Sequence, residues 1–237
     1  MRKEPFEQGD YVHVYARGHR KENIVRDARD RWHFLQTIYY FNNINSMANP
    51  FRELRELLKL NFNKRLAWPS TWPPQQPIVK ILAFSLVENH YHLQLKEEKE
   101  GGVTTFMRRV NTSIAKYFNT KYKEEGRLFQ GSFGARKVRN DEDLAYLSVY
   151  IQVKNILELY PGGLAAAKKN FNRAFQWAVE YPYGSLGDYA GTRNSPIIDK
   201  EVLGKIFPTK EGYLKFAKEC FLGMNLKNKL GGLVFED

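Results

Sequence analysis

The feature that most constrains the fold is a pair of strand-like runs in residues 78–97. Both runs are rich in apolar residues, and Glu88 and Asn89 stand between them at the expected turn. This pattern predicts a β-hairpin. Because side chains alternate between the two faces of a strand, the second run divides into two sets: His90, His92 and Gln94 on one face, and Tyr91, Leu93 and Leu95 on the other.

The remaining patterns place helices and further strands around this hairpin. Residues 10–18 alternate like a strand that ends at a glycine, and residues 27–44 have helical spacing that Asp27 can cap. The elements expected further along the chain are a short helix at 49–62, a proline-rich loop at 68–77, a helix at 101–126, a strand or loop at 126–140, a helix at 140–163 and an amphipathic helix at 209–224. This order predicts an α+β fold, a ferredoxin-like or RRM-like antiparallel sheet with helices on one face, followed by a C-terminal extension.

The net charge of the chain is +11, which favours polyanionic partners, with nucleic acid first and anionic membrane surfaces second. Charge alone leaves open a basic enzyme without such a partner. The single cysteine, Cys220, excludes a disulfide within the chain and a cysteine-based metal site. No apolar run approaches the roughly 18 residues that span a membrane, and the first residues lack the apolar core of a signal peptide. We therefore expect a protein of the reducing cytoplasm without a membrane partner.

The two histidines of the hairpin have the spacing of a metal-binding pair. Residues two apart on a strand have Cα atoms roughly 6–7 Å apart, so His90 and His92 can share one divalent cation. Two imidazoles leave the coordination sphere incomplete, and further ligands have to come from another element, from water or from a substrate phosphate. The competing interpretation is that both are polar residues on a solvated sheet face.

Four segments together resemble a known family. Residues 88–95, "ENHYHLQL", look like the His-hydrophobic-His signature of HUH single-strand endonucleases. Three further segments are similar to REP-associated single-tyrosine transposases: 11–35 to their first strand, Arg-Gly turn and first helix, 121–151 to their Gly-x-Leu-Phe-Gln-Gly-x-Phe loop and tyrosine helix, and 181–203 to their C-terminal segment. The resemblance covers roughly residues 10–215 and leaves about 62–77 as an insertion. It implies an HUH-type catalytic domain at 1–180 and a C-terminal extension at 181–237.

The resemblance implies a metal-dependent transposase or endonuclease that cleaves and rejoins single-stranded DNA. A tyrosine hydroxyl attacks a phosphate to form a 5′-phosphotyrosine link, while His90 and His92 hold Mg²⁺ or Mn²⁺. The family's tyrosine falls on Tyr150, and Tyr146, one helical turn earlier on the same face, is the alternative. Either could instead be a half-buried aromatic residue. The implied partner is hairpin-forming repeat DNA, bound by a monomer or homodimer in the bacterial cytoplasm in association with the nucleoid.

At the expected position of a third metal ligand the chain departs from the family pattern. The family places an Asn or Gln ligand four residues after the tyrosine, where this chain has Lys154, and a charged lysine offers no acceptor to a cation. Asn155 could serve through a shift of helix register, Gln152 or a water could replace it, and Glu88 could add a carboxylate. If none does, the chain is a catalytically lapsed single-stranded nucleic-acid-binding protein on the same fold. A third alternative is an unrelated α+β RNA-binding module with an incidental histidine pair.

Basic and aromatic residues are interleaved around these motifs, as in a path where cations follow phosphates and rings stack on bases. The candidate DNA-binding residues are Arg17, His19, Arg20, Arg108, Arg109, Arg127, Gln130, Arg136, Lys137 and Lys154. For each of them, a solvated surface charge is the competing interpretation. If the path exists, DNA affinity falls steeply with salt concentration.

Overall fold

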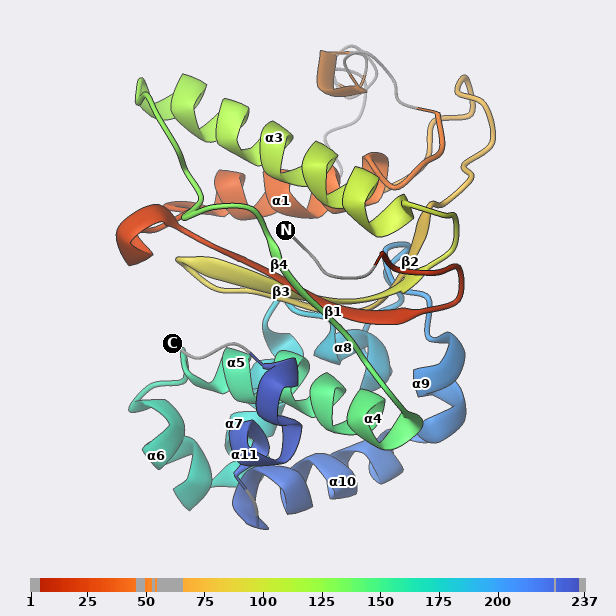
Figure 1. Cartoon of the computed structure of the whole chain (residues 1–237). Coiled ribbons are helices and arrows are strands. Elements are labelled where there is room, and N and C mark those ends of the chain that lie inside the picture. Colours follow the sequence, from red (N-terminus) through yellow and green to blue (C-terminus); the bar gives the residue numbers. More distant parts are fainter. Residues whose placement is uncertain (1–4, 46–49, 53, 55–65, 224, 235–237) are drawn as a thin grey trace.

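The computed structural model describes residues 5–45, 50–52, 54, 66–223 and 225–234. They contain a four-stranded antiparallel sheet with the strand order β2-β3-β1-β4 (Figure 1). The strands are β1 (Tyr11–Arg17), β2 (Val79–Leu86), β3 (His90–Glu97) and β4 (Gly134–Lys137), with α1 (Ala28–Tyr40) between β1 and β2 and α3 (Gly102–Tyr122) between β3 and β4. The chain order is therefore βαββαβ, which is the ferredoxin-like arrangement. The predicted α+β fold class is confirmed.

The local patterns explain where these elements begin and end. The hairpin predicted at 78–97 is formed by β2 and β3, and α1 starts after Asp27, whose side chain accepts the amide of Asp30 in a capping box. The loop expected at 68–77 has no regular secondary structure. Of the short helix expected at 49–62, residues 50–52 and 54 are helical, and the rest lies outside the described residues.

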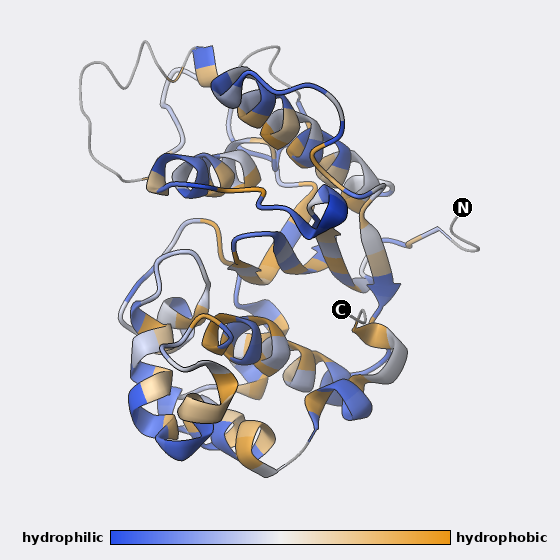
Figure 2. Ribbon diagram, turned by 90° about the vertical axis from the view of Figure 1, so that its left-hand side faces the viewer, coloured by the Kyte–Doolittle hydropathy of each residue, from blue (hydrophilic) through white to orange (hydrophobic). Residues whose placement is uncertain are grey.

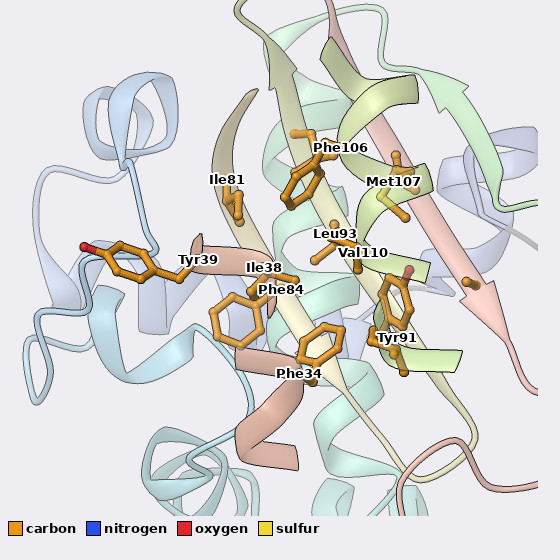
Figure 3. Close-up of a cluster of buried hydrophobic side chains, with 14 of the residues drawn as sticks. Phe34, Ile38, Tyr39, Ile81, Phe84, Tyr91, Leu93, Phe106, Met107 and Val110 are labelled. Atoms are coloured by element: carbon orange, nitrogen blue, oxygen red, sulfur yellow. The ribbon is translucent and has the colours of Figure 1, made fainter. Parts of the chain in front are cut away.

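One face of the sheet is covered by α1 and α3, as predicted (Figure 1). The apolar side chains of β3 point to this face, where Tyr91 and Leu93 join Phe34 of α1 and Phe106 of α3 in one buried cluster (Figure 3). Full burial of such a side chain contributes about 1.5–3 kcal/mol. This layer therefore supplies a large part of the hydrophobic stabilisation of the sheet.

The opposite face of the sheet is covered as well. The elements on this side are α4 (Asp141–Val149), η2 (Tyr150–Lys154), α5 (Asn155–Leu157), α6 (Gly163–Lys169), α7 (Phe171–Glu180), α8 (Leu186–Tyr189), α9 (Glu201–Ile206), α10 (Lys210–Gly223), α11 (Leu226–Leu230) and η3 (Gly231–Leu233). They form a second apolar cluster, in which Tyr150, Tyr213 and Leu233 are buried. Figure 2 shows the strands between the two helical layers.

The helix predicted at 140–163 contains a π-helical turn. Asn140 caps its start by accepting the amide of Asp143 at 2.8 Å. Within η2 the amide of Asn155 donates to the carbonyl of Tyr150, five residues earlier. A π turn holds one residue more than an α turn, so every later side chain moves by one position around the axis. As a result Asn155, and not Lys154, takes the place one turn after Tyr150. We call the continuous run of α4, η2 and α5 the tyrosine helix.

The C-terminal part adds helices to the same layer. The amphipathic helix expected at 209–224 is formed by α10. The other helices of this part, α6, α7, α8, α9 and α11, were not predicted. Helices before and after residue 180 share one apolar cluster, and the division of the chain at that residue stays a prediction. Among the described residues, no helix is long and apolar enough to cross a bilayer.

Candidate active site

Three buried histidines lie on the sheet face beneath the tyrosine helix. His90, His92 and His13 are 6%, 4% and 0% exposed, and the register of β1 with β3 pairs Tyr15 with His92 and Arg17 with His90. The rings of His90 and His92 have centroids 5.0 Å apart and are nearly perpendicular, at 87°. The prediction that both histidines share one face is confirmed. Their interpretation as residues of a solvated surface is wrong, because the tyrosine helix covers them.

The side-chain amide of Asn89 fixes the tautomer of His90. Its Nδ2 donates to the carbonyl of Lys21 at 3.2 Å, so its Oδ1 is the atom that lies 2.6 Å from Nδ1 of His90. An amide oxygen only accepts hydrogen bonds, and Nδ1 of His90 therefore carries the proton. In a neutral ring the lone pair then resides on Nε2, the form in which an imidazole binds a metal.

His92 is held in the same way by a second histidine. Its Nδ1 lies 2.9 Å from Nε2 of His13, and Nδ1 of His13 lies 2.6 Å from the carbonyl oxygen of Leu233. Burial lowers the pKa of His13 to about 4. Burial also lowers the pKa of His92 well below its ordinary value, and the neighbouring basic side chains, His13 first, act in the same direction. Both rings are therefore neutral at pH 7, as a metal ligand has to be.

Tyr150, the first residue of η2, lies against these histidines. Its ring centroid lies 5.7 Å from that of His92 and 6.3 Å from that of His13, and the residue is 1% exposed. Tyr146 instead contacts Phe216 of α10, with ring centroids 5.3 Å apart. Although the two tyrosines are one turn apart, Tyr150 contacts the histidines and Tyr146 contacts the C-terminal helices.

Lys154 also belongs to this centre. Its Nζ lies 5.0 Å from the ring centroid of Tyr150, and the same ammonium group forms an ion pair with Glu158, one turn later. A positive charge beside the ring favours negative charge on the tyrosine oxygen or on a group bound to it. The Lys154 side chain is mostly removed from solvent, and the carboxylate of Glu158 offsets part of the cost of burying its ammonium group.

The histidine pair needs partners of another residue type to complete a metal site. Among the described residues, no three His, Cys, Asp or Glu side chains come together as metal ligands. Asn155 is 1% exposed, and its Nδ2 has no hydrogen-bond partner in the part of the chain that the structure describes. An amide N–H donor buried without an acceptor is costly, and an acceptor such as a phosphate oxygen of a bound strand would offset part of the cost. The side-chain oxygen of Asn155 would then be the atom available to a metal.

The two other candidate ligands have different surroundings. The amide of Gln152 is hydrogen-bonded at both ends, because Nε2 donates to the Tyr213 hydroxyl at 3.0 Å and Oε1 accepts from Ser185 Oγ at 2.8 Å. Glu88 stands at the hairpin turn, where its side chain is 58% exposed and lies 3.8 Å from Arg31. The structure thus places Gln152 in a buried network and Glu88 at the surface.

Part of the predicted DNA-binding set comes together near His90. The Gln130 amide donates to the Arg17 carbonyl at 2.9 Å, and the His19 amide donates to the Leu128 carbonyl at 2.8 Å. These bonds join the "LFQGSF" loop to the end of β1 and to η1 (His19–Lys21), next to the strand end that carries His90. The residues collected there are Arg17, His19, Arg20, Arg127 and Gln130.

The other basic candidates are divided between the two faces of the sheet. Arg136 lies on the histidine face of β4. Lys137 points to the opposite face and lies 2.7 Å from Asp10. Arg108 and Arg109 belong to α3, which covers that opposite face. The structure therefore does not bring Lys137, Arg108 or Arg109 to the histidines.

Two residues of the centre were missed by sequence reasoning, His13 and Tyr15. The ring of Tyr15 stacks on His92 with centroids 5.9 Å apart and an angle of 19°. A signal was present, because the strand "YVHVYAR" alternates polar or aromatic residues with Val12, Val14 and Ala16. The contact of His13 with Leu233 has no such signal, since the two residues are 220 positions apart.

This centre belongs to a ferredoxin-like domain in which a His-x-His strand faces a tyrosine carried by a helix. The family model described as "Transposase IS200 like" matches residues 75–154, about a third of the chain. The matched stretch runs from the loop before β2 to the end of η2 and includes His90, His92 and Tyr150. The chain is therefore similar to IS200-like transposases over this stretch, and the predicted resemblance is confirmed there.

A solved structure of a REP-associated tyrosine transposase bound to a REP hairpin is similar to the chain. The sequence identity is 11% and the TM-score is 0.44, over 85% of this chain and 94% of that one. A search of curated proteins gives no match.

Proposed function

We propose that the protein is a divalent-metal-dependent tyrosine transposase that cleaves and rejoins single-stranded DNA through a 5′-phosphotyrosine intermediate. The observation that carries the proposal is the position of Tyr150, 5.7 Å from His92 between ring centroids, beside a His-x-His pair whose Nδ1 atoms are both hydrogen-bonded. A phenol with an ordinary pKa near 10 is a weak nucleophile at pH 7, so it needs an activated phosphate nearby. The match of residues 75–154 to the IS200-like model supports the same reaction class.

The residues that would hold Mg²⁺ or Mn²⁺ are His90 and His92, through Nε2, and Asn155, through its side-chain oxygen. A mixed set of nitrogen and oxygen donors fits Mn²⁺ better than Mg²⁺, which prefers oxygens. The π-helical turn supports Asn155 in this role, because it gives that residue the place that an α-helix would give to Lys154. When bound, the ion would polarise the scissile phosphate.

The chain's own residues then perform two transfers. The Tyr150 oxygen forms a bond to phosphorus, the bond from phosphorus to the 3′ oxygen breaks, the phenol proton leaves to solvent and the 3′ oxygen takes up a proton. In the reverse direction a 3′-OH attacks the phosphotyrosine and releases the tyrosine, so the strands rejoin without an external energy source. Lys154 would contact the phosphate, and the side chains of Arg17, Arg20 and Arg127 would hold the strand.

The substrate we propose is single-stranded DNA next to a hairpin formed by a short repeat, as the family resemblance implies. The proposal assigns catalysis to residues 1–180, with 181–237 as an extension, in a monomer or homodimer.

One observation favours the alternative function, a lapsed nucleic-acid-binding protein on the same fold. Tyr150 is only 1% exposed, so a DNA strand can reach it only after covering segments move. A chain that never makes this movement would bind the strand without cutting it.

The test is the formation of a covalent protein–DNA adduct. Wild-type protein is incubated with labelled hairpin-flanked single-stranded DNA and Mn²⁺ or Mg²⁺, and the products are separated on a denaturing gel. We expect an adduct that requires the metal, that disappears in Tyr150→Phe and that persists in Tyr146→Phe, because the first phenol contacts the histidines and the second does not.

An adduct that survives Tyr150→Phe would overturn the choice of nucleophile. Wild-type protein that binds the DNA but forms no adduct with either metal would establish the binding-protein alternative.

A further inference from the structure

A series of hydrogen bonds runs from the C-terminal segment to His92. It begins at the carbonyl oxygen of Leu233 in η3, 2.6 Å from Nδ1 of His13. It continues from Nε2 of His13 to Nδ1 of His92, over 2.9 Å. The two rings are stacked, with centroids 5.1 Å apart and planes inclined by 20°, and His13 is fully buried.

The carbonyl oxygen of Leu233 determines which nitrogen carries the proton in both His13 and His92. A carbonyl oxygen only accepts, so Nδ1 of His13 is the protonated nitrogen. Nε2 of a neutral His13 must then accept, and Nδ1 of His92 must donate to it. This leaves the lone pair of His92 on Nε2, the atom on the side away from His13. If His13 were absent, the isolated ring of His92 could carry its proton on either nitrogen.

The C-terminal segment is itself anchored to the tyrosine helix. Leu226, Leu230 and Leu233 are buried in the cluster that contains Tyr150. Lys229 of α11 lies 2.8 Å from Glu142 of α4. The carbonyl of Leu233 is therefore held in place by the same layer that positions the tyrosine.

We propose that His13 is a positioning residue, which takes its tautomer from the backbone carbonyl of Leu233 and imposes on His92 the tautomer that exposes Nε2 to a metal. The role in metal binding rests on the proposed function, whereas the two hydrogen bonds are present without metal or DNA. It assigns a part in the active centre to η3 at the far end of the described chain. Partners that orient a ligating histidine typically change metal affinity by about 10–100-fold when they are removed.

The test observes the tautomer directly in the metal-free full-length protein. Long-range ¹H–¹⁵N correlation spectra of ¹⁵N-histidine-labelled protein distinguish the two tautomers of each neutral ring. We expect wild-type His92 to be protonated at Nδ1. His13→Gln should keep that state, because a glutamine amide oxygen reaches the position of Nε2 and accepts the same proton. His13→Leu should shift His92 toward the Nε2-protonated form.

A second readout is Mn²⁺ affinity without DNA. We expect His13→Leu to weaken binding about 10–100-fold, and His13→Gln to stay within about threefold of wild type. Truncation after Leu230 removes the carbonyl of Leu233 but leaves His13. It should shift the His92 tautomer in the same direction as His13→Leu, and it provides the test if His13→Leu does not fold. His33→Leu removes another buried histidine, on the other side of the sheet, and should leave the His92 spectrum unchanged.

Two outcomes would overturn the inference: a wild-type His92 protonated at Nε2, or a folded His13→Leu with unchanged tautomer and unchanged Mn²⁺ affinity. Failure of the proposed function looks different. In that case wild-type protein forms no adduct with DNA, while the tautomer of His92 still responds to His13.

Discussion

The two faces of the sheet are built on the same strands and are both buried, but they differ in what is buried. The face under α1 and α3 carries Tyr91, Leu93 and Leu95 of β3 within an apolar cluster. The face under the tyrosine helix carries three histidines and Gln94, whose Nε2 donates to the carbonyl of Leu144 at 3.1 Å. Apolar groups contribute through area removed from water, whereas buried polar groups cost free energy unless they are hydrogen-bonded.

The comparison teaches that burial alone does not tell which face of the sheet serves stability and which presents polar groups to a ligand. An imidazole is costly to bury unless its nitrogens are hydrogen-bonded. Each of the three histidines forms a hydrogen bond at Nδ1. The apolar face stabilises the fold, and the histidine face holds lone pairs in fixed directions. Substitutions on the first should therefore change stability, and those on the second should change ligand binding.

The largest expected effect is on the apolar face. Phe106→Ala should lower the free energy of unfolding by about 4 kcal/mol, because it empties a fully buried ring site. Urea denaturation measures the loss, and Thr104→Ala, at an exposed position of the same helix, should stay within about 0.5 kcal/mol of wild type. Mn²⁺ affinity under conditions where Phe106→Ala is folded should not change. A parallel loss of Mn²⁺ binding would show that the two faces are not separable.

A smaller effect is expected on the histidine face at Asn155. Asn155→Ala should weaken Mn²⁺ binding by about 10–100-fold and change stability by less than about 1 kcal/mol, because its Nδ2 has no partner to lose among the described residues. Isothermal titration with Mn²⁺ measures the first change, and Asn172→Ala, at an exposed position of α7, is the matched control. If Asn155→Ala binds Mn²⁺ with unchanged affinity, Asn155 is not a ligand, and water or a substrate phosphate takes the third position.

The smallest expected effect concerns a histidine on the apolar side. Burial lowers the pKa of His33 to about 4, against the opposing charge of Asp30. The folded state then binds this proton less readily than the unfolded state, so stability falls as the pH drops from about 6.5 toward 4. In wild type the ring centroids of His33 and Tyr117 are 3.8 Å apart, and a phenylalanine ring can keep this stacking. Between pH 7 and pH 5 the free energy of unfolding of His33→Phe should therefore fall by about 1–2 kcal/mol less than that of wild type.

Denaturation midpoints at the two pH values, compared between wild type and His33→Phe, measure this difference. Equal losses of stability in both proteins would mean that protonation of His33 does not cause the loss in wild type, and burial of this histidine would then carry no energetic cost of the expected size.

The parts of the fold that could be predicted are those set by local periodicity. The hairpin follows from two alternating runs around a turn, and α3 follows from the spacing of Phe106, Val110 and Ile114. The missed helix α7 has an equally readable stripe, with Phe171 and Phe175 one turn apart and Ala178 after them, so its omission was not forced by the sequence.

The rest of the site depends on features that no local pattern records. A π turn adds one residue to a turn without changing the apolar character of the helix, so the exchange of places between Lys154 and Asn155 could be considered from sequence but not decided. The pairing of β1 with β3 brings His13 to His92 across 79 positions. Such contacts arise from topology, and they assemble the part of the site that sequence reasoning missed.

The bond from His13 to Leu233 also has a consequence for how the protein comes into being. A chain leaves the ribosome from its N-terminus, so His13, His92 and Tyr150 are all available for folding before Leu233 has been synthesised. A nascent chain can form the sheet and the tyrosine helix while the acceptor that sets the histidine tautomers is still missing. A centre built in this way is completed last, after translation has passed the helices that hold Leu233.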